Sequence, residues 1–320
     1  MEEKKYNLIL NIGPPRTGTT YLFDMLYNSP QHIKDNIAPQ SPWKMLDKHY
    51  DRYKKGRIDN TQFTRFKMRF KESDTYTSNF HLSMFLDCPE RLSEYVDSFA
   101  VAGISSKYIY VNSPNILVSN VDTETGFRDL QGITCTVQNI QAIDKKIDNI
   151  FKLKNELFTN FFKKASPVFE NIHIISGYRW KNRIDSLVGM IEYYFDGTHL
   201  NNYSYTDLFE LEKFSDIIPY IKIYDLLQQL IENTEHIDNI HHTILDFEYL
   251  NDSKYLYKKL KWLFDSQEQI QNNPAFGKKS FASKISQENR QYKLPKFLYD
   301  YYLPHLEQQK IFFDKYIHAD

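Results

Sequence analysis

Glycine and cysteine are scarce in this sequence, and no long apolar run is present. Ten glycines in 320 residues, together with 16% aromatic residues, exclude collagen-like, linker-like and disordered chains. Two cysteines, Cys88 and Cys135, cannot form a disulfide scaffold, which fits a reducing compartment. No run approaches the about 18 apolar residues of a membrane-spanning helix, and the mixed charges of the first residues do not resemble a signal peptide. These absences predict a cytoplasmic protein without a membrane span.

Net charge is also nearly absent. Lys plus Arg number 40 and Asp plus Glu 41, so the formal net charge is -1, which argues against a nucleic-acid partner. Residues 44–71 depart from this average, because they are rich in lysine and arginine and contain few acids. We interpret residues 44–100 as a basic helical insertion, which is either a solvated surface or a wall that attracts an anionic acceptor. No linker and no repeat divides the chain, so residues 1–320 are predicted to form a single domain around this insertion.

Four short apolar runs predict buried β-strands, and stretches between and after them predict helices. The strands are expected at residues 6–12, at 101–104 or 108–111, at 171–177 and at 242–247. The helices are expected at residues 151–164, 254–264 and 294–316. Strands that alternate with helices favour a parallel sheet covered on both faces. The predicted fold is therefore α/β, with three layers and a central parallel β-sheet flanked by helices.

Residues 13–20, GPPRTGTT, lie between the first predicted strand and a helix. Two glycines are separated by four residues and followed by two threonines, in the strand–loop–helix context that a phosphate-binding loop requires. Gly18 lets the backbone curl so that successive N–H groups point inward, and the start of the helix adds N–H donors and a partial positive charge. The segment therefore predicts a site for anionic oxygens.

One position in this loop separates two kinds of chemistry. Nucleoside triphosphatases need lysine directly after the second glycine, and here Thr19 occupies that position, so that Arg16 is the only cation of the loop. Residues 16–20 resemble the 5′-phosphosulfate loop of the sulfotransferases that use 3′-phosphoadenosine 5′-phosphosulfate (PAPS), which implies their P-loop-like fold. The resemblance also implies that Arg16 is catalytic, because it would stabilise charge on the bridging oxygen as the sulfuryl group leaves. The residues that it assigns to the cofactor here are Pro15, Arg16, Thr17, Gly18, Thr19, Thr20 and Tyr21.

Residues 172–195 carry a second basic motif, in which a helix follows a predicted strand. Arg179, Arg183 and Ser186 are spaced by four and three residues, so they share one face if the helix starts by Arg179. Two guanidinium groups and a hydroxyl suit a phosphate monoester, since arginine binds phosphate through two hydrogen bonds. The segment resembles the 3′-phosphate motif of the same family, whose usual spacing would place the arginine one residue earlier, on Tyr178. Either Arg179 or Arg183 is therefore expected to bind the cofactor's 3′-phosphate together with Ser186.

Two later segments are similar to this family as well. Residues 241–264 resemble its late strand, Glu-x-Leu turn and following helix, and Glu248 is assigned a structural role in capping or pairing. Residues 273–290 form a polar basic loop before the last predicted helix, and in the family a basic loop at this place closes over the nucleotide. Lys278 and Lys279 are candidates for binding its phosphates, and the alternative is a solvated lysine pair.

The resemblance leaves the general base open. Carbohydrate-type members of the family place a glutamate shortly after the first helix, and residues 38–43 contain no acid. The candidates for the base are Asp35, Asp47, His49 and His81. His49 and His81 are taken as the catalytic candidates, and for each of them the alternative is an ordinary surface histidine.

The resemblance implies an enzyme that moves the sulfuryl group from PAPS to a hydroxyl or amine acceptor and releases 3′-phosphoadenosine 5′-phosphate (PAP), without a metal. Ser106 and Lys107 lie in a stretch similar to the family's substrate side and are expected to contact the donor or the acceptor. The acceptor stays open between a carbohydrate and another small molecule, with an anionic one among the choices. Two alternatives remain: a P-loop nucleotide kinase, which would need the missing lysine, and a non-catalytic PAP- or nucleotide-binding protein of the same fold.

Overall fold

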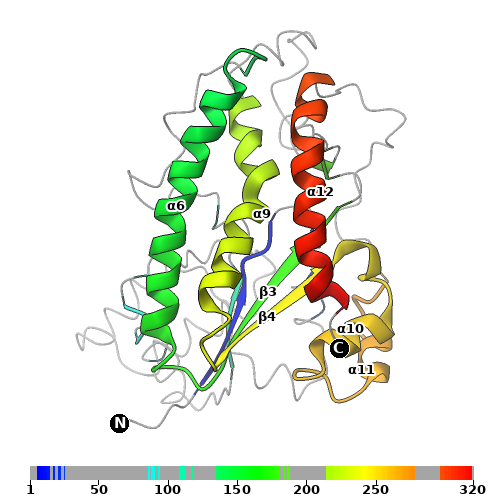
Figure 1. Cartoon of the computed structure of the whole chain (residues 1–320). Coiled ribbons are helices and arrows are strands. Elements are labelled where there is room, and N and C mark those ends of the chain that lie inside the picture. Colours follow the sequence, from blue (N-terminus) through cyan, green and yellow to red (C-terminus); the bar gives the residue numbers. More distant parts are fainter. Residues whose placement is uncertain are drawn as a thin grey trace, which may run out of the picture.

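Within the part of the chain that the structure describes, the centre of the computed structural model is a four-stranded parallel β-sheet (Figure 1). Its strands are β1 (Asn7–Asn11), β2 (Tyr108–Asn112), β3 (Ile172–Tyr178) and β4 (Ile240–Asp246), in the order β2-β1-β3-β4. All three neighbouring pairs are parallel, as predicted, and the second strand lies at the later of its two predicted places. The described residues are 6–14, 17–18, 21–22, 25, 86, 88–90, 93, 108–112, 117, 135–180, 183–184, 186–187, 214–277 and 296–318.

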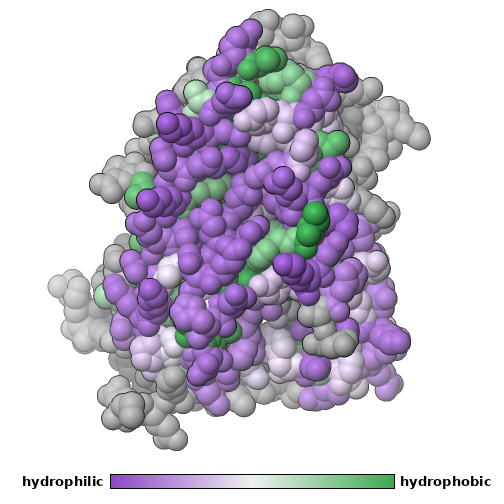
Figure 2. Space-filling view, in the orientation of Figure 1, coloured by the Kyte–Doolittle hydropathy of each residue, from purple (hydrophilic) through white to green (hydrophobic). Residues whose placement is uncertain are grey.

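Three long helices lie side by side on one face of the sheet (Figure 1). They are α6 (Ile140–Ala165), α9 (Phe214–Thr234) and α12 (Lys296–His318). Their apolar sides form one core with sheet residues such as Leu8, Ile174 and Ile244. The outer side of this layer is mainly hydrophilic, with small hydrophobic spots (Figure 2). Helix α6 is longer than the helix predicted at residues 151–164, and α12 is shifted by two residues from the helix predicted at 294–316. Helix α9 was not predicted.

Smaller elements cover the opposite face. They are the 3-10 helix η4 (Phe247–Tyr249), α10 (Ser253–Leu260) and α11 (Gln267–Gln271). Ile9, Ile175 and Leu245 point to this side, because successive strand residues alternate between faces, and they form a second core with the helix that follows β1. A sheet with a core on each face confirms the predicted three-layer α/β arrangement.

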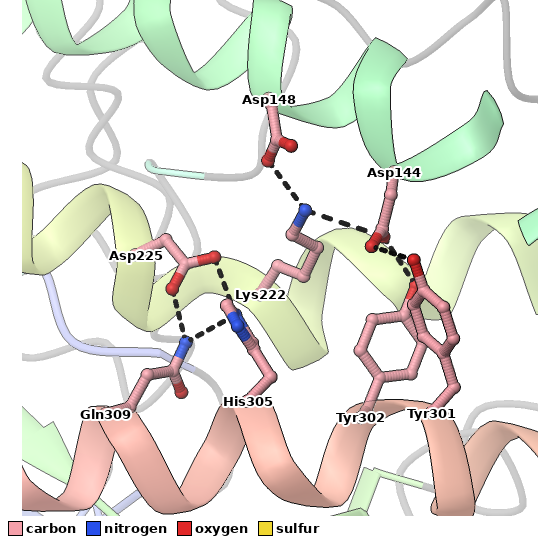
Figure 3. A network of polar contacts seen from close by, with 8 residues as sticks. All are labelled: Asp144, Asp148, Lys222, Asp225, Tyr301, Tyr302, His305 and Gln309. Atoms are coloured by element: carbon pink, nitrogen blue, oxygen red, sulfur yellow. Dashed lines mark hydrogen bonds and ion pairs between the residues drawn. The ribbon is translucent and has the colours of Figure 1, made fainter. Parts of the chain in front are cut away.

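Polar contacts connect the three helices of the first layer (Figure 3). The buried ammonium of Lys222 on α9 lies 2.6 Å from the Asp148 carboxylate and 3.5 Å from that of Asp144, both on α6. The hydroxyls of Tyr301 and Tyr302 on α12 donate to Asp144 at 2.9 and 2.7 Å. Burying charged groups without partners is costly, so this arrangement strongly favours one register of the helices.

Two sequence-based expectations concern the rest of the chain. The basic insertion predicted at residues 44–100 lies outside the described residues, except for 86, 88–90 and 93. Among the helices described above, none has the length and apolar content that crossing a membrane requires.

Candidate functional site

The loop after β1 adopts the tight turn that its sequence predicts. Thr17 is buried, and its hydroxyl donates to the backbone oxygen of Pro14 at 2.6 Å, which closes the turn. Gly18 has a φ of +88°, a left-handed conformation that glycine adopts without steric cost. The backbone N–H of Leu22 donates to the Gly18 oxygen at 2.9 Å, so helical hydrogen bonding starts directly after the turn. A turn followed by a helix start leaves backbone N–H groups available for an anion.

The position of this loop in the sheet matches that of ligand sites in open α/β folds. Strand β2 lies next to β1 towards one edge of the sheet, whereas β3 and then β4 lie towards the other edge. Such a reversal of strand order opens a crevice at the carboxyl ends of the two central strands, where ligands bind. The loop after β1 and the residues after β3 both lie at this point.

Gly177 of β3 lets the loop lie directly against the strand. A Cβ atom at this position would overlap the backbone oxygen and the hydroxyl of Thr17. The backbone oxygen cannot rotate away as a side chain would, so any larger residue would displace the loop. Gly177 therefore brings the loop and the end of β3 into contact.

Arg179 and Ser186, predicted to bind the same phosphate, are hydrogen-bonded to each other. Arg179 directly follows β3, and its Nη1 donates to Ser186 Oγ at 2.9 Å. The guanidinium carbon lies 4.2 Å from the centroid of the Phe247 ring, which directly follows β4 in the adjacent strand. The same ring reaches the loop, since a Cβ on Gly18 would lie 3.8 Å from Phe247 Cδ2. Phe247 thus lies near both the loop and Arg179.

Arg183, the other candidate for the 3′-phosphate, has a different environment. It is 1% exposed, its Nη2 donates to the backbone oxygen of Tyr220 at 2.9 Å, and its guanidinium lies 5.2 Å from the Tyr224 ring centroid. Burial lowers the pKa of this guanidinium. These contacts attach Arg183 to α9, and it is Arg179 that is hydrogen-bonded to Ser186.

A distant turn lies beside the helix that follows the loop. Asn273 Nδ2 donates to the backbone oxygen of Met25 at 2.7 Å, and its Oδ1 accepts from the Ala275 N–H at 2.9 Å. Tyr21, from the same helix, is buried, which raises the pKa of its hydroxyl to about 12, while the backbone of Gly277 acts in the opposite direction. Gly277 therefore lies next to the helix that follows the β1 loop.

Most of the remaining predicted site residues lie outside the described part of the chain. Glu248 was predicted to act in capping or pairing, and the cap of η4 is formed by Asp246, whose side chain accepts from the Glu248 N–H at 2.9 Å. Within the described residues, no group of three or more His, Cys, Asp or Glu side chains is arranged to hold a metal ion. The predicted residues that lie outside the described ones are Pro15, Arg16, Thr19, Thr20, Asp35, Asp47, His49, His81, Ser106, Lys107, Lys278 and Lys279.

Sequence reasoning missed Phe247, which lies near both the loop and Arg179. Its signal was available, because residues that directly follow neighbouring parallel strands meet at one edge of a sheet. A comparison with protein-family models and with curated proteins finds no match to this chain. The functional assignment therefore depends on the loop, the Arg179–Ser186 pair and their place in the sheet.

Proposed function

We propose that this protein is a PAPS-dependent sulfotransferase with the P-loop-like fold of that family, which moves the sulfuryl group to a hydroxyl or amine acceptor. The observation that carries the proposal is that the Phe247 ring has the guanidinium of Arg179 over it and its edge near Gly18 of the β1 loop. Two groups suited to anions thus lie near one aromatic ring. A nucleotide with phosphates on both its 5′ and its 3′ positions needs two such groups.

The residues present fit this nucleotide better than they fit ATP. The backbone at Thr17 and Gly18 suits a terminal phosphosulfate, and Arg179 with Ser186 suits a phosphate monoester, because guanidinium groups bind phosphate bidentately. The Ser186 oxygen accepts from Arg179, which leaves the hydroxyl proton able to donate. ATP carries no 3′-phosphate for this pair, and Thr19 replaces the lysine that a nucleotide kinase needs.

The proposed chemistry needs positioning and charge stabilisation from the protein. The acceptor attacks sulfur in line, the bond from sulfur to the 5′-phosphate oxygen breaks, and PAP takes the negative charge. The loop N–H groups and Arg16 would stabilise the charge that develops on those oxygens. The proton of the acceptor passes to a base, for which His49 and His81 remain the candidates.

Thermal unfolding with separate nucleotides tests the proposal. A ligand that binds only the folded protein at 100 times its Kd adds about 2.7 kcal/mol to the free energy of unfolding. PAP and PAPS are expected to raise Tm, whereas ATP with Mg²⁺ is expected to have little effect. Stabilisation by ATP with Mg²⁺ but not by PAP would favour the kinase alternative and contradict the proposal.

A further inference from the structure

Tyr224 holds the backbone of Arg179 from a distant helix. The Arg179 N–H donates to the Tyr224 hydroxyl at 2.9 Å, although the two residues are 45 positions apart. The paired register of β3 and β4 ends at Tyr178 and Asp246, so Arg179 is the first residue after the ladder. The Tyr224 side chain on α9 therefore hydrogen-bonds the backbone directly after the last residue pair of β3 and β4.

The ring of Tyr224 is fixed on several sides. It is 1% exposed, and its centroid lies 4.9 Å from that of Tyr178 on β3 and 5.5 Å from that of Phe313 on α12. The guanidinium of Arg183 lies 5.2 Å from the same centroid. Close-packed aromatic neighbours restrict the side chain to one rotamer, so the hydroxyl has a defined position.

The polar contacts of Figure 3 fix α9 on both sides of Tyr224 in the sequence. Lys222 binds the carboxylates of α6, and Asp225 accepts from Gln309 of α12 at 2.6 Å and lies 2.8 Å from His305 Nε2. These contacts fix the rotation of α9 about its axis and its position along that axis, because a shift of the helix by one residue would break all of them. The position of α9 therefore determines where the Tyr224 hydroxyl accepts the hydrogen bond from the Arg179 N–H.

We propose that Tyr224 is a positioning residue for recognition of the nucleotide's 3′-phosphate, which rests on the function proposed above. Arg179 is then held at two points, its backbone by Tyr224 and its guanidinium by Ser186 over the Phe247 ring. A side chain that is fixed before the ligand arrives loses less conformational freedom on binding. The hydroxyl of Tyr224 thereby contributes to the preference for a 3′-phosphorylated nucleotide without touching it.

Calorimetric titration of the full chain with PAP and with AMP, which lacks the 3′-phosphate, tests this role. Tyr224→Phe keeps the ring and removes the acceptor of the Arg179 N–H. We expect it to weaken PAP binding about tenfold while AMP binding stays unchanged, because one buried hydrogen bond of about 1.4 kcal/mol corresponds to that factor. Tyr316→Phe is the matched control, since it removes a tyrosine hydroxyl that binds Glu235 and not the Arg179 N–H.

The outcomes separate this role from the function on which it rests. A preference for PAP over AMP that falls about tenfold in Tyr224→Phe and stays at the wild-type value in Tyr316→Phe supports the role. An unchanged preference in Tyr224→Phe, or equal losses for PAP and AMP, overturns it and leaves the sulfotransferase proposal standing. Failure of the wild-type protein to bind PAP contradicts both.

Discussion

Replacing Gly177 by alanine is expected to weaken the binding of PAP about a hundredfold, which corresponds to about 2.7 kcal/mol. The new methyl group would overlap the backbone oxygen and the hydroxyl of Thr17. β3 is the second central strand and is buried along its whole length, so the loop must move instead of the strand. A displaced loop would lose its close approach to the end of β3, so the proposed anion site of the loop would move away from Arg179.

Ser176→Ala is the control for this substitution. Ser176 precedes Gly177 in β3, is fully buried and points to the face that α6, α9 and α12 cover. Its hydroxyl has no hydrogen-bond partner among the described residues. We expect Ser176→Ala to bind PAP as the wild type does. Calorimetry on both variants, with circular dichroism to confirm folding, makes the comparison. Wild-type affinity in Gly177→Ala would mean that the loop does not bind the nucleotide.

Acidification from pH 6.5 to pH 4 is expected to destabilise the fold. Burial, followed by the nearby charge of His241, lowers the pKa of both His173 and His242 from 6.5 to about 4. Each is neutral in the fold, whereas the unfolded chain takes up protons below pH 6.5. The stabilisation is therefore intact above about pH 6.5 and is lost as the pH falls towards 4, by about 3 kcal/mol for each histidine.

The contacts of these histidines explain why they resist protonation. The Thr234 hydroxyl donates to the Leu230 oxygen at 2.5 Å, so at 2.8 Å from His242 Nε2 it must accept that ring's proton. His173 stacks on Trp262 with ring centroids 3.7 Å apart. The Nδ1 atoms of both rings are buried and have no hydrogen-bond partner among the described residues, so a proton added there would have no acceptor.

Urea unfolding between pH 7 and pH 4.5 measures this loss. Two titrating histidines predict that the free energy of unfolding falls by up to about 2.7 kcal/mol per pH unit between their folded and unfolded pKa values. His173→Phe keeps an aromatic ring against Trp262 and removes one titrating group, so it should halve this slope. The same slope in both proteins would show that His173 is not responsible.

The sheet could be predicted from the sequence, whereas the contacts that organise the site could only partly be predicted. Buried parallel strands are continuous apolar runs, which is why they could be predicted, whereas the strand order that places the loop after β1 at a ligand edge is seen only in the structure. Helical spacing predicted one shared face for Arg179, Arg183 and Ser186, but Arg179 precedes the helix and meets Ser186 from the end of the strand. Arg183 instead faces α9.

Helix α9 is a second element that could not be predicted from the sequence pattern. It contains Pro219 and is buried on several sides, with Ile221, Leu226 and Leu227 all in the core, so it has no simple amphipathic pattern. Because Tyr224 lies on this helix, no local signal connects it with Arg179. Its role follows only from tertiary packing.

The release of PAP from PAPS in the presence of carbohydrate, phenol and amine acceptors, compared between the wild type and Arg16→Ala, tests the central claim most directly. The wild type is expected to release PAP with an acceptor of one of these classes. Arg16→Ala is expected to fold normally and to lose activity about a hundredfold to a thousandfold, as when one donor to a developing charge is removed. Full activity of Arg16→Ala would contradict the catalytic role of Arg16, and PAP binding without release by the wild type would indicate a non-catalytic nucleotide-binding protein.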